Sequence, residues 1–274
     1  MKETIQHVLA LSEQERAAYV LQNGDLLIAD MLTHIGDRDP ELRDQLNYRL
    51  FIELLSAGHF SPEQLQQLAK TVGSRESLSF GLRTDDPTAV FTRSFSALWL
   101  TGLLHADRQL SYLIEEDAVA ILETAAYYLQ RERDVRGLTE DGWAHSMAHG
   151  ADLAIAVIQH PAFQIRFAPI ILQGIKAALW KGRVYTDDED ERFAKIIGAL
   201  AAVDFPEEVL LEWAEQLMDK LTHHSYAAGY DRDFYQARTN TLMLLRALYF
   251  NLKFTHRYEK LRGQVSMFIQ EWMK

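Results

Sequence analysis

Apolar residues recur every three or four positions through almost the whole chain, whereas the strict alternation of a half-buried β-strand is scarce. One such run consists of Val209, Leu210, Trp213, Leu217 and Leu221. This spacing returns the side chains to one face of an α-helix, and that face then packs against a neighbouring element. The pattern therefore predicts an all-α fold.

The ends of the predicted helices are well marked. Ser12 and Ser61 each stand three residues before a glutamate or glutamine, which is the spacing of a capping box. Gly58, Gly137 and Gly182 follow periodic segments, where a glycine commonly ends a helix. These signals place helices in successive pairs, at residues 40–57 and 61–72, 87–105 and 113–132, 139–159 and 162–181, 187–203 and 206–222, and 231–252 and 255–272.

Successive pairs begin about 44 to 52 residues apart, which is close to the period of about 40–47 residues in HEAT and armadillo repeats. No Pro/Gly/Ser-rich linker or low-complexity stretch divides the chain. We therefore expect residues 1–274 to form a single all-helical domain, a right-handed α-α superhelix (solenoid) of HEAT or armadillo type. In it, residues 1–36 form an N-terminal cap and residues 37–274 about five helical hairpins. Because no consensus recurs within the units, an irregular multi-helix bundle is the alternative.

Charge and composition exclude several classes of function. The formal net charge of −11 opposes general binding to nucleic acid or to an anionic membrane, since both usually require a basic face. The absence of cysteine excludes disulfides, thiolate zinc sites and cysteine nucleophiles, so that His, Asp and Glu are the metal ligands left. The N-terminus lacks the pattern of a signal peptide and no long apolar run follows, which predicts a cytoplasmic protein.

The most chemically capable cluster lies on the predicted helix 139–159. Its spacing puts four polar side chains within an arc of roughly 80°: Asp141, His145, His149 and Asp152. The apolar side chains of the opposite face are Trp143, Met147, Ala151, Ala154 and Ile158. Solvated helix faces normally carry better helix formers than Asp and His. Gly150 inside the helix also indicates close approach of a neighbouring backbone or ligand.

Three interpretations of this stripe are open. His145 and His149, four residues apart, could share a divalent ion such as zinc, manganese, iron or nickel, with Asp152 as a third ligand. Alternatively, Asp141 and Asp152 orient the imidazoles, giving a buried polar network or a histidine general base. The stripe could also be an ordinary solvated face, because neither an H-E-x-x-H nor an E-x-x-H motif accompanies it.

Flanking segments carry further candidates. Asp134 and Arg136 could join the site or pair with one another, and Arg93 could reach an anion or neutralise nearby acids. Asp188 and Asp190 could contribute to a cation site or simply stabilise the positive end of a helix.

The polar connection at residues 73–86 either borders a binding groove or merely joins two helices. No P-loop, G-x-S-x-G or G-x-G-x-x-G motif occurs, which removes the common NTPase, hydrolase and Rossmann interpretations.

Four short segments together resemble the bacterial domain-of-unknown-function family 2785: Arg93 to Ser96, Arg133 to Gly137, Gly142 to Asp152, and Glu189 to Arg192. The specific part is the segment G-W-A-H-S-M-A-H-G-A-D, and we expect the resemblance to span nearly the whole chain. It implies an uncharacterised helical family, so it indicates where a site lies without supplying an activity. The residues that it favours are His145, His149 and Asp152, followed by Asp134, Arg136, Arg93 and Asp190.

Two functions follow from these residues. The first is a binding or scaffold protein whose polar groove takes a protein or a small anionic ligand without catalysis. The ligand-binding residues would be His145, His149, Asp152, Asp141, Arg136 and Arg93. The alternative is a metal-dependent hydrolase with His145, His149 and Asp152 as ligands. In it, Asp134 or Asp190 completes the shell and Arg136 or Arg93 stabilises an anionic substrate.

Overall fold

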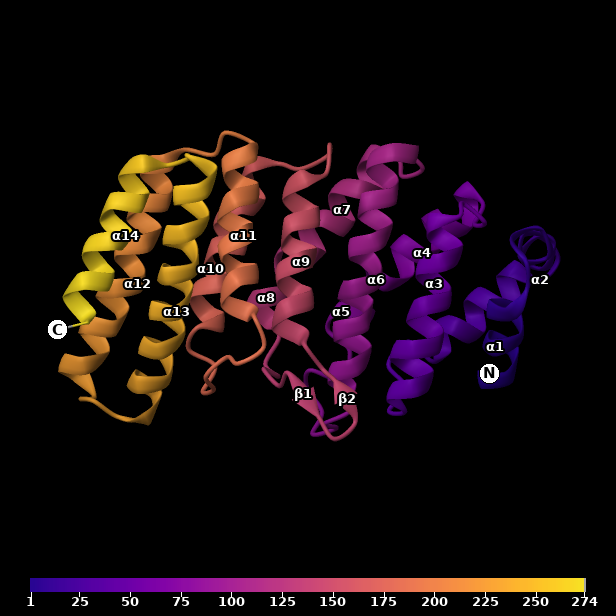
Figure 1. The fold of residues 1–274 in the computed structure, drawn as a ribbon, viewed down its shortest axis with the longest axis horizontal. Coiled ribbons are helices and arrows are strands. Elements are labelled where there is room, and N and C mark those ends of the chain that lie inside the picture. The colour runs from indigo at the N-terminus through magenta and orange to yellow at the C-terminus, as the bar shows by residue number, and fades with distance from the viewer. Residues whose placement is uncertain (274) are drawn as a thin grey trace.

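A computed structural model describes residues 1–273, and in that range the chain is mainly helical with almost no strand (Figure 1). The all-α prediction is thus confirmed. The helices of the N-terminal half are α1 (Lys2–Ala10), α2 (Glu13–Thr33), a π-helix (Glu41–Tyr48) that continues into α3 (Arg49–Ser56), α4 (Pro62–Val72), α5 (Arg75–Leu78), α6 (Ala89–Leu110), α7 (Glu115–Ala126) and α8 (Tyr128–Arg131). They are followed by strands β1 (Leu138–Thr139) and β2 (Gly142–Trp143) and then by α9 (Ser146–Gln159), a 3-10 helix (Ile165–Phe167), α10 (Ala168–Ala178), α11 (Glu189–Ala202), α12 (Glu207–Ala227), α13 (Arg232–Thr255) and α14 (Glu259–Trp272).

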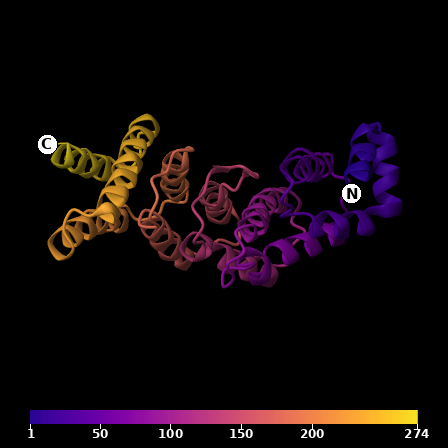
Figure 2. The same cartoon turned by 90° about the horizontal axis from the view of Figure 1, so that it is seen from below.

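The long helices succeed one another along the longest axis of the molecule. Helix α6 packs against α9, α9 against α11, and α11 against α13, while α10 contacts α7 and α8, and α12 contacts α14. Figure 2 shows that this row is curved, with the N-terminal and C-terminal ends turned toward the same side. The chain order is therefore also the spatial order.

One hydrophobic cluster follows the row, from Ile5 in α1 to Val265 in α14. Large rings fill it where helices meet; Phe51 of α3, for example, stacks on Trp99 of α6 with 4.1 Å between ring centroids. Within residues 1–273, no helix combines the length and apolar character needed to cross a membrane.

Several predicted helix ends are confirmed by side-chain contacts. Ser12 and Ser61 both form complete capping boxes, at the starts of α2 and α4. The segment 40–57 is helical as predicted, but its first half is wound as a π-helix. Gly150 meets a close neighbour, because a Cβ there would lie 2.6 Å from the ring of Tyr128.

The predicted helix over 139–159 is wrong in its first third. Residues 138–143 form a small antiparallel hairpin, with Leu138 opposite Trp143 and Thr139 opposite Gly142, and α9 begins only at Ser146. The Thr139 hydroxyl donates to the Gly142 carbonyl, and Gly142 has φ = +85°, a conformation that favours glycine. Asp141 therefore lies in a turn rather than on the helix.

The apolar face predicted for this segment is confirmed only within α9. Trp143 is on β2 and remains 40% exposed. The buried members are Met147, Ala151, Ala154 and Ile158.

Two further predicted helices are interrupted. The segment 113–132 is divided at Tyr127 into α7 and α8. The segment 162–181 begins with irregular chain and a 3-10 turn, and α10 begins at Ala168, just before Pro169, because proline fits the first turn of an α-helix.

Candidate functional site

The hairpin places two histidines next to each other at the start of α9. His145 precedes the helix and has φ = +50°, a left-handed conformation uncommon for a non-glycine residue. Its ring stacks on Trp143, with 4.5 Å between centroids, and meets the edge of the His149 ring at 5.6 Å. The histidines are neighbours because the backbone turns at His145, not because both lie on one helix.

His149 is buried and its tautomer follows from its contacts. Its Nδ1 lies 2.8 Å from the Ser94 hydroxyl oxygen on α6, and that hydroxyl donates to the Ala144 carbonyl. Since a hydroxyl has one hydrogen, Nδ1 must carry the proton and donate to Ser94, which leaves Nε2 as an acceptor. Burial lowers the pKa of His149 to about 3, with help from His145 and Arg192, so the ring is neutral.

His145 faces two carboxylates from the start of α11. Its Nε2 is 3.9 Å from Asp188 Oδ1 and its Nδ1 is 3.9 Å from Glu189 Oε1. Nδ1 is buried and has no hydrogen-bond partner in the part of the chain that the structure describes. Burial lowers the pKa of His145, and the positive charge of Arg192 adds to this, although Asp188 opposes it.

Asp152 pairs with Arg192 of α11, which is the partner that the sequence did not indicate. The Arg192 guanidinium pairs with Asp152 and, at 3.3 Å, with Asp188. Burial raises the pKa of the Asp152 carboxyl, and the charge of Arg192 counteracts this. Asp152 thus joins α9 to α11.

Arg43 of the π-helix anchors the hairpin from a distant part of the sequence. Its side chain is fully buried, with the guanidinium 4.1 Å from the Phe91 ring centre. It donates to the carbonyls of Asp37, at 2.7 Å, and Asp141, at 2.9 Å, and pairs with Asp44 at 2.7 Å. The hairpin is therefore fixed to the N-terminal helices.

The remaining sequence-predicted residues lie outside this cluster. Asp141 pairs with Arg38 at 3.0 Å, and Asp134 pairs with Arg136 at 2.6 Å. Arg93 forms a buried double hydrogen bond with Glu132, which no sequence pattern indicated. Asp190 lines a separate cavity between α11 and α13.

Sequence reasoning also missed residues that shape the site. Ser94 lies in the segment Arg93 to Ser96, whose arginine is its only residue with an evident charge for binding. Glu189 lies in the acidic run at the start of α11, between Asp188 and Asp190, and nothing in the sequence distinguishes it from them. Arg43 gives no local signal of its role, because its partner in the hairpin, the Asp141 carbonyl, is about a hundred residues away in the sequence.

The geometry gives the predicted three-ligand metal set no support. Within residues 1–273, no group of three or more His, Asp or Glu side chains is placed to hold a metal ion. The Asp152 carboxylate, which is the third member of that set, is paired with Arg192 instead. Ser94 is equally unsuited to act as a nucleophile, since it is buried and its hydrogen is given to a carbonyl rather than to the histidine.

Fold and site together define an all-helical protein whose polar cluster is built from a hairpin and the ends of two neighbouring helices. A family model described as a protein of unknown function (DUF2785) matches residues 78–250, more than half of the chain, and the protein belongs to this family. The match contains the hairpin, α9 and α11, but it is shorter than the nearly complete span expected from the sequence. No curated protein and no solved structure is significantly similar to the chain.

Proposed function

We propose that this protein is a cytoplasmic α-α superhelix of HEAT type that acts as a binding protein. The sequential packing of α6, α9, α11 and α13 supports this arrangement, as does a core that follows the row of helices. The curvature in Figure 2 agrees with it, since stacked helical hairpins form curved surfaces that bind extended partners. The polar groups around His145 and His149 largely form hydrogen bonds and ion pairs with one another, which fits binding better than catalysis.

We further propose that the surface formed by Trp143, His145 and Asp188 binds a basic segment of a protein partner. The observation that carries this is the partly exposed Trp143, stacked on a histidine that lies 3.9 Å from two carboxylates. An anionic ligand would meet these carboxylates unfavourably. A lysine or arginine side chain gains the exposed Asp188 carboxylate and the face of the indole ring that His145 leaves open.

Peptide display on the immobilised full chain tests this proposal. The peptides that enrich should carry lysine or arginine. Trp143→Ala should weaken the binding of the best peptide at least tenfold, because exposed tryptophans commonly contribute about 2 kcal/mol or more at interfaces. Dissociation constants from fluorescence anisotropy provide the measurement.

The matched control is Phe254→Ala, which removes another exposed aromatic ring, near the end of α13. It should leave the affinity within twofold of the unmodified chain. Enrichment of acidic peptides, or equal loss of affinity in both variants, would refute the proposed surface.

A further inference from the structure

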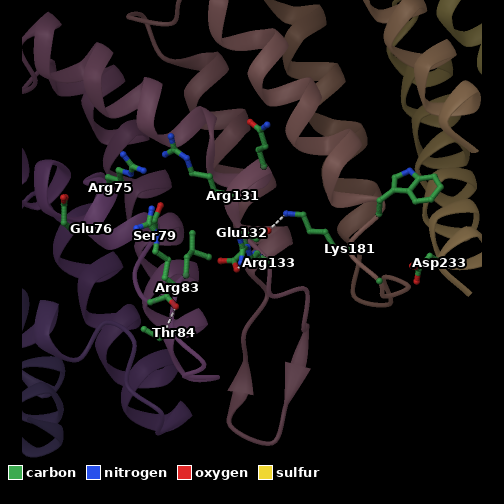
Figure 3. Close-up of a pocket in the computed structure, with 15 residues that line it drawn as sticks. Arg75, Glu76, Ser79, Arg83, Thr84, Arg131, Glu132, Arg133, Lys181 and Asp233 are labelled. Carbon is green, nitrogen blue, oxygen red and sulfur yellow. Dashed lines mark hydrogen bonds between the residues drawn. The ribbon is translucent and has the colours of Figure 1, made fainter. Parts of the chain in front are cut away.

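A second polar region lies on the side of α8 and α10, away from the histidines. A cavity of about 1220 Å³ opens between the 73–86 connection, the end of α8 and the end of α10 (Figure 3). Its cationic lining consists of Arg75, Arg83, Arg131, Arg133 and Lys181, against the acidic Glu76, Glu132 and Asp233. The lining of the cavity therefore has a positive net charge, although the whole chain has a formal net charge of −11.

The arginines of this cavity differ from Arg93, which is buried, and from Arg192, which is half-buried. Arg93 and Arg192 each pair with a carboxylate. Within residues 1–273, none of the four cavity arginines forms an ion pair. Figure 3 shows the Arg75 and Arg131 side chains next to each other, and the charge of Arg75, after burial, lowers the pKa of Arg131. Like charges so placed favour an anion between them.

The floor of the cavity contains Lys181, which is held by the backbone. Lys181 donates to the Leu129 carbonyl at 2.7 Å and to the Glu132 carbonyl. The Glu132 carboxylate is hydrogen-bonded to Arg93 and to two backbone N–H groups rather than to Lys181, and its charge acts on the lysine only from a distance. Burial lowers the pKa of Lys181 to about 8, so the ammonium is still largely charged at neutral pH.

We propose that this cavity binds a small organic molecule carrying several phosphate groups. Arg75 and Arg131 would hold one phosphate and Arg83 and Arg133 another, because the planar guanidinium fork matches phosphate oxygens with paired hydrogen bonds. Ser79 adds a hydroxyl donor to the wall, whereas the Thr84 hydroxyl donates to the Gly81 carbonyl and offers only its oxygen. The cavity is much larger than a single phosphate, which favours an elongated polyanion.

This site is independent of the histidine cluster and gives the 73–86 connection a binding role. The sequence left open whether that segment borders a groove or merely joins two helices. Ser79, Arg83 and Thr84 of this connection line the cavity, and the Phe80 carbonyl accepts a hydrogen bond from Arg93 at 2.7 Å. The connection is thereby tied to the same arginine that holds the Glu132 segment.

Isothermal titration calorimetry with inorganic triphosphate as the probe tests the proposal on the full chain at constant ionic strength. We expect micromolar binding of triphosphate and at least tenfold weaker binding of monophosphate. Arg83→Gln/Arg133→Gln should weaken triphosphate binding at least tenfold. Both side chains are exposed, so the melting temperature of this variant should match that of the unmodified chain.

The control with the same change of net charge is Arg166→Gln/Arg246→Gln, at two exposed arginines that do not line the cavity. It should change the affinity less than twofold. If both double variants bound triphosphate equally weakly, binding would depend only on the overall charge of the protein, and the proposal would be overturned. Displacement of triphosphate by a tighter-binding single-stranded oligonucleotide would also overturn it, in favour of nucleic acid.

Discussion

Ser94 determines which nitrogen of His149 carries a proton. Its single hydrogen goes to the Ala144 carbonyl, so its oxygen accepts from His149 Nδ1–H. A protonated imidazolium could still donate to Ser94, but its charge would lie in a buried site beside Arg192. The fold therefore holds His149 as a neutral residue, and its protonation is coupled to unfolding.

That coupling predicts an acid-dependent loss of stability. The pKa of His149 falls from about 6.5 in the unfolded chain to about 3 in the folded one. Between these values the unfolded chain binds more protons, so the free energy of unfolding decreases as the pH falls below about 6.5. In urea unfolding, the free energy of unfolding should decrease between pH 7.5 and pH 5.5 by about 1.4 kcal/mol more in the unmodified chain than in His149→Gln.

The comparison with His149→Gln isolates this residue from its titrating neighbours. The lowered pKa of His145 acts in the same direction, and the raised pKa of the Asp152 carboxyl acts in the opposite direction. Both contributions are present in the unmodified chain and in the variant, so they largely cancel when the two proteins are compared. The glutamine amide can still donate to Ser94. If the free energy of unfolding changed equally with pH in the unmodified chain and in His149→Gln, the prediction would be contradicted.

Among the elements, the long helices could be predicted from the sequence and the hairpin could not. Apolar periodicity and capping boxes are local signals, and the helices that carry them, such as α4 and α13, lie close to their predicted ranges. The hairpin depends on Gly142 and on Arg43, which binds it from the π-helix. A periodic pattern that continued across residues 139–145 concealed this non-local contact.

The candidate site was predictable to the same degree. His149 and Asp152 lie on α9 as the spacing indicated, and His145 is adjacent to His149. Their partners could not be predicted, because Ser94 and Arg192 reach them from other helices, each about forty or more residues away in the sequence. The local pattern thus identified the segment, while tertiary packing determined its chemistry.

Replacing Arg43 should release the hairpin. Arg43→Met keeps an apolar chain against Phe91 but removes the donors to the Asp37 and Asp141 carbonyls and leaves Asp44 without its partner. We expect a loss of about 3 kcal/mol in the free energy of unfolding. Hydrogen exchange measured by mass spectrometry should accelerate at residues 137–145 before other segments.

The control is Arg49→Met on α3, an exposed arginine whose partner Glu53 also pairs with Arg16. Its effect should stay within about 0.5 kcal/mol. Unchanged exchange at residues 137–145 in Arg43→Met would show that the hairpin does not depend on this anchor.

For the molecule as a whole, the N-terminal helices and the family region are structurally interdependent. The family match begins at residue 78, yet the hairpin inside it is held by Arg43, which lies before that point. The hydrophobic cluster likewise continues from α1 into α6 without a break. The segment before residue 78 therefore supports the site even though it lies outside the matched region.

The proposed superhelix makes a prediction about overall size. A compact domain of 274 residues has a radius of gyration of about 19 Å. Stacked hairpins extend along one axis, and the row in Figure 1 is long relative to its height. Small-angle X-ray scattering of the monomeric fraction, with its mass checked by light scattering, should give a radius clearly above 19 Å and an asymmetric distance distribution. A monomer with a radius near 19 Å and a symmetric distribution would favour the irregular bundle instead, because only a folded-back arrangement brings the two ends of the row close together.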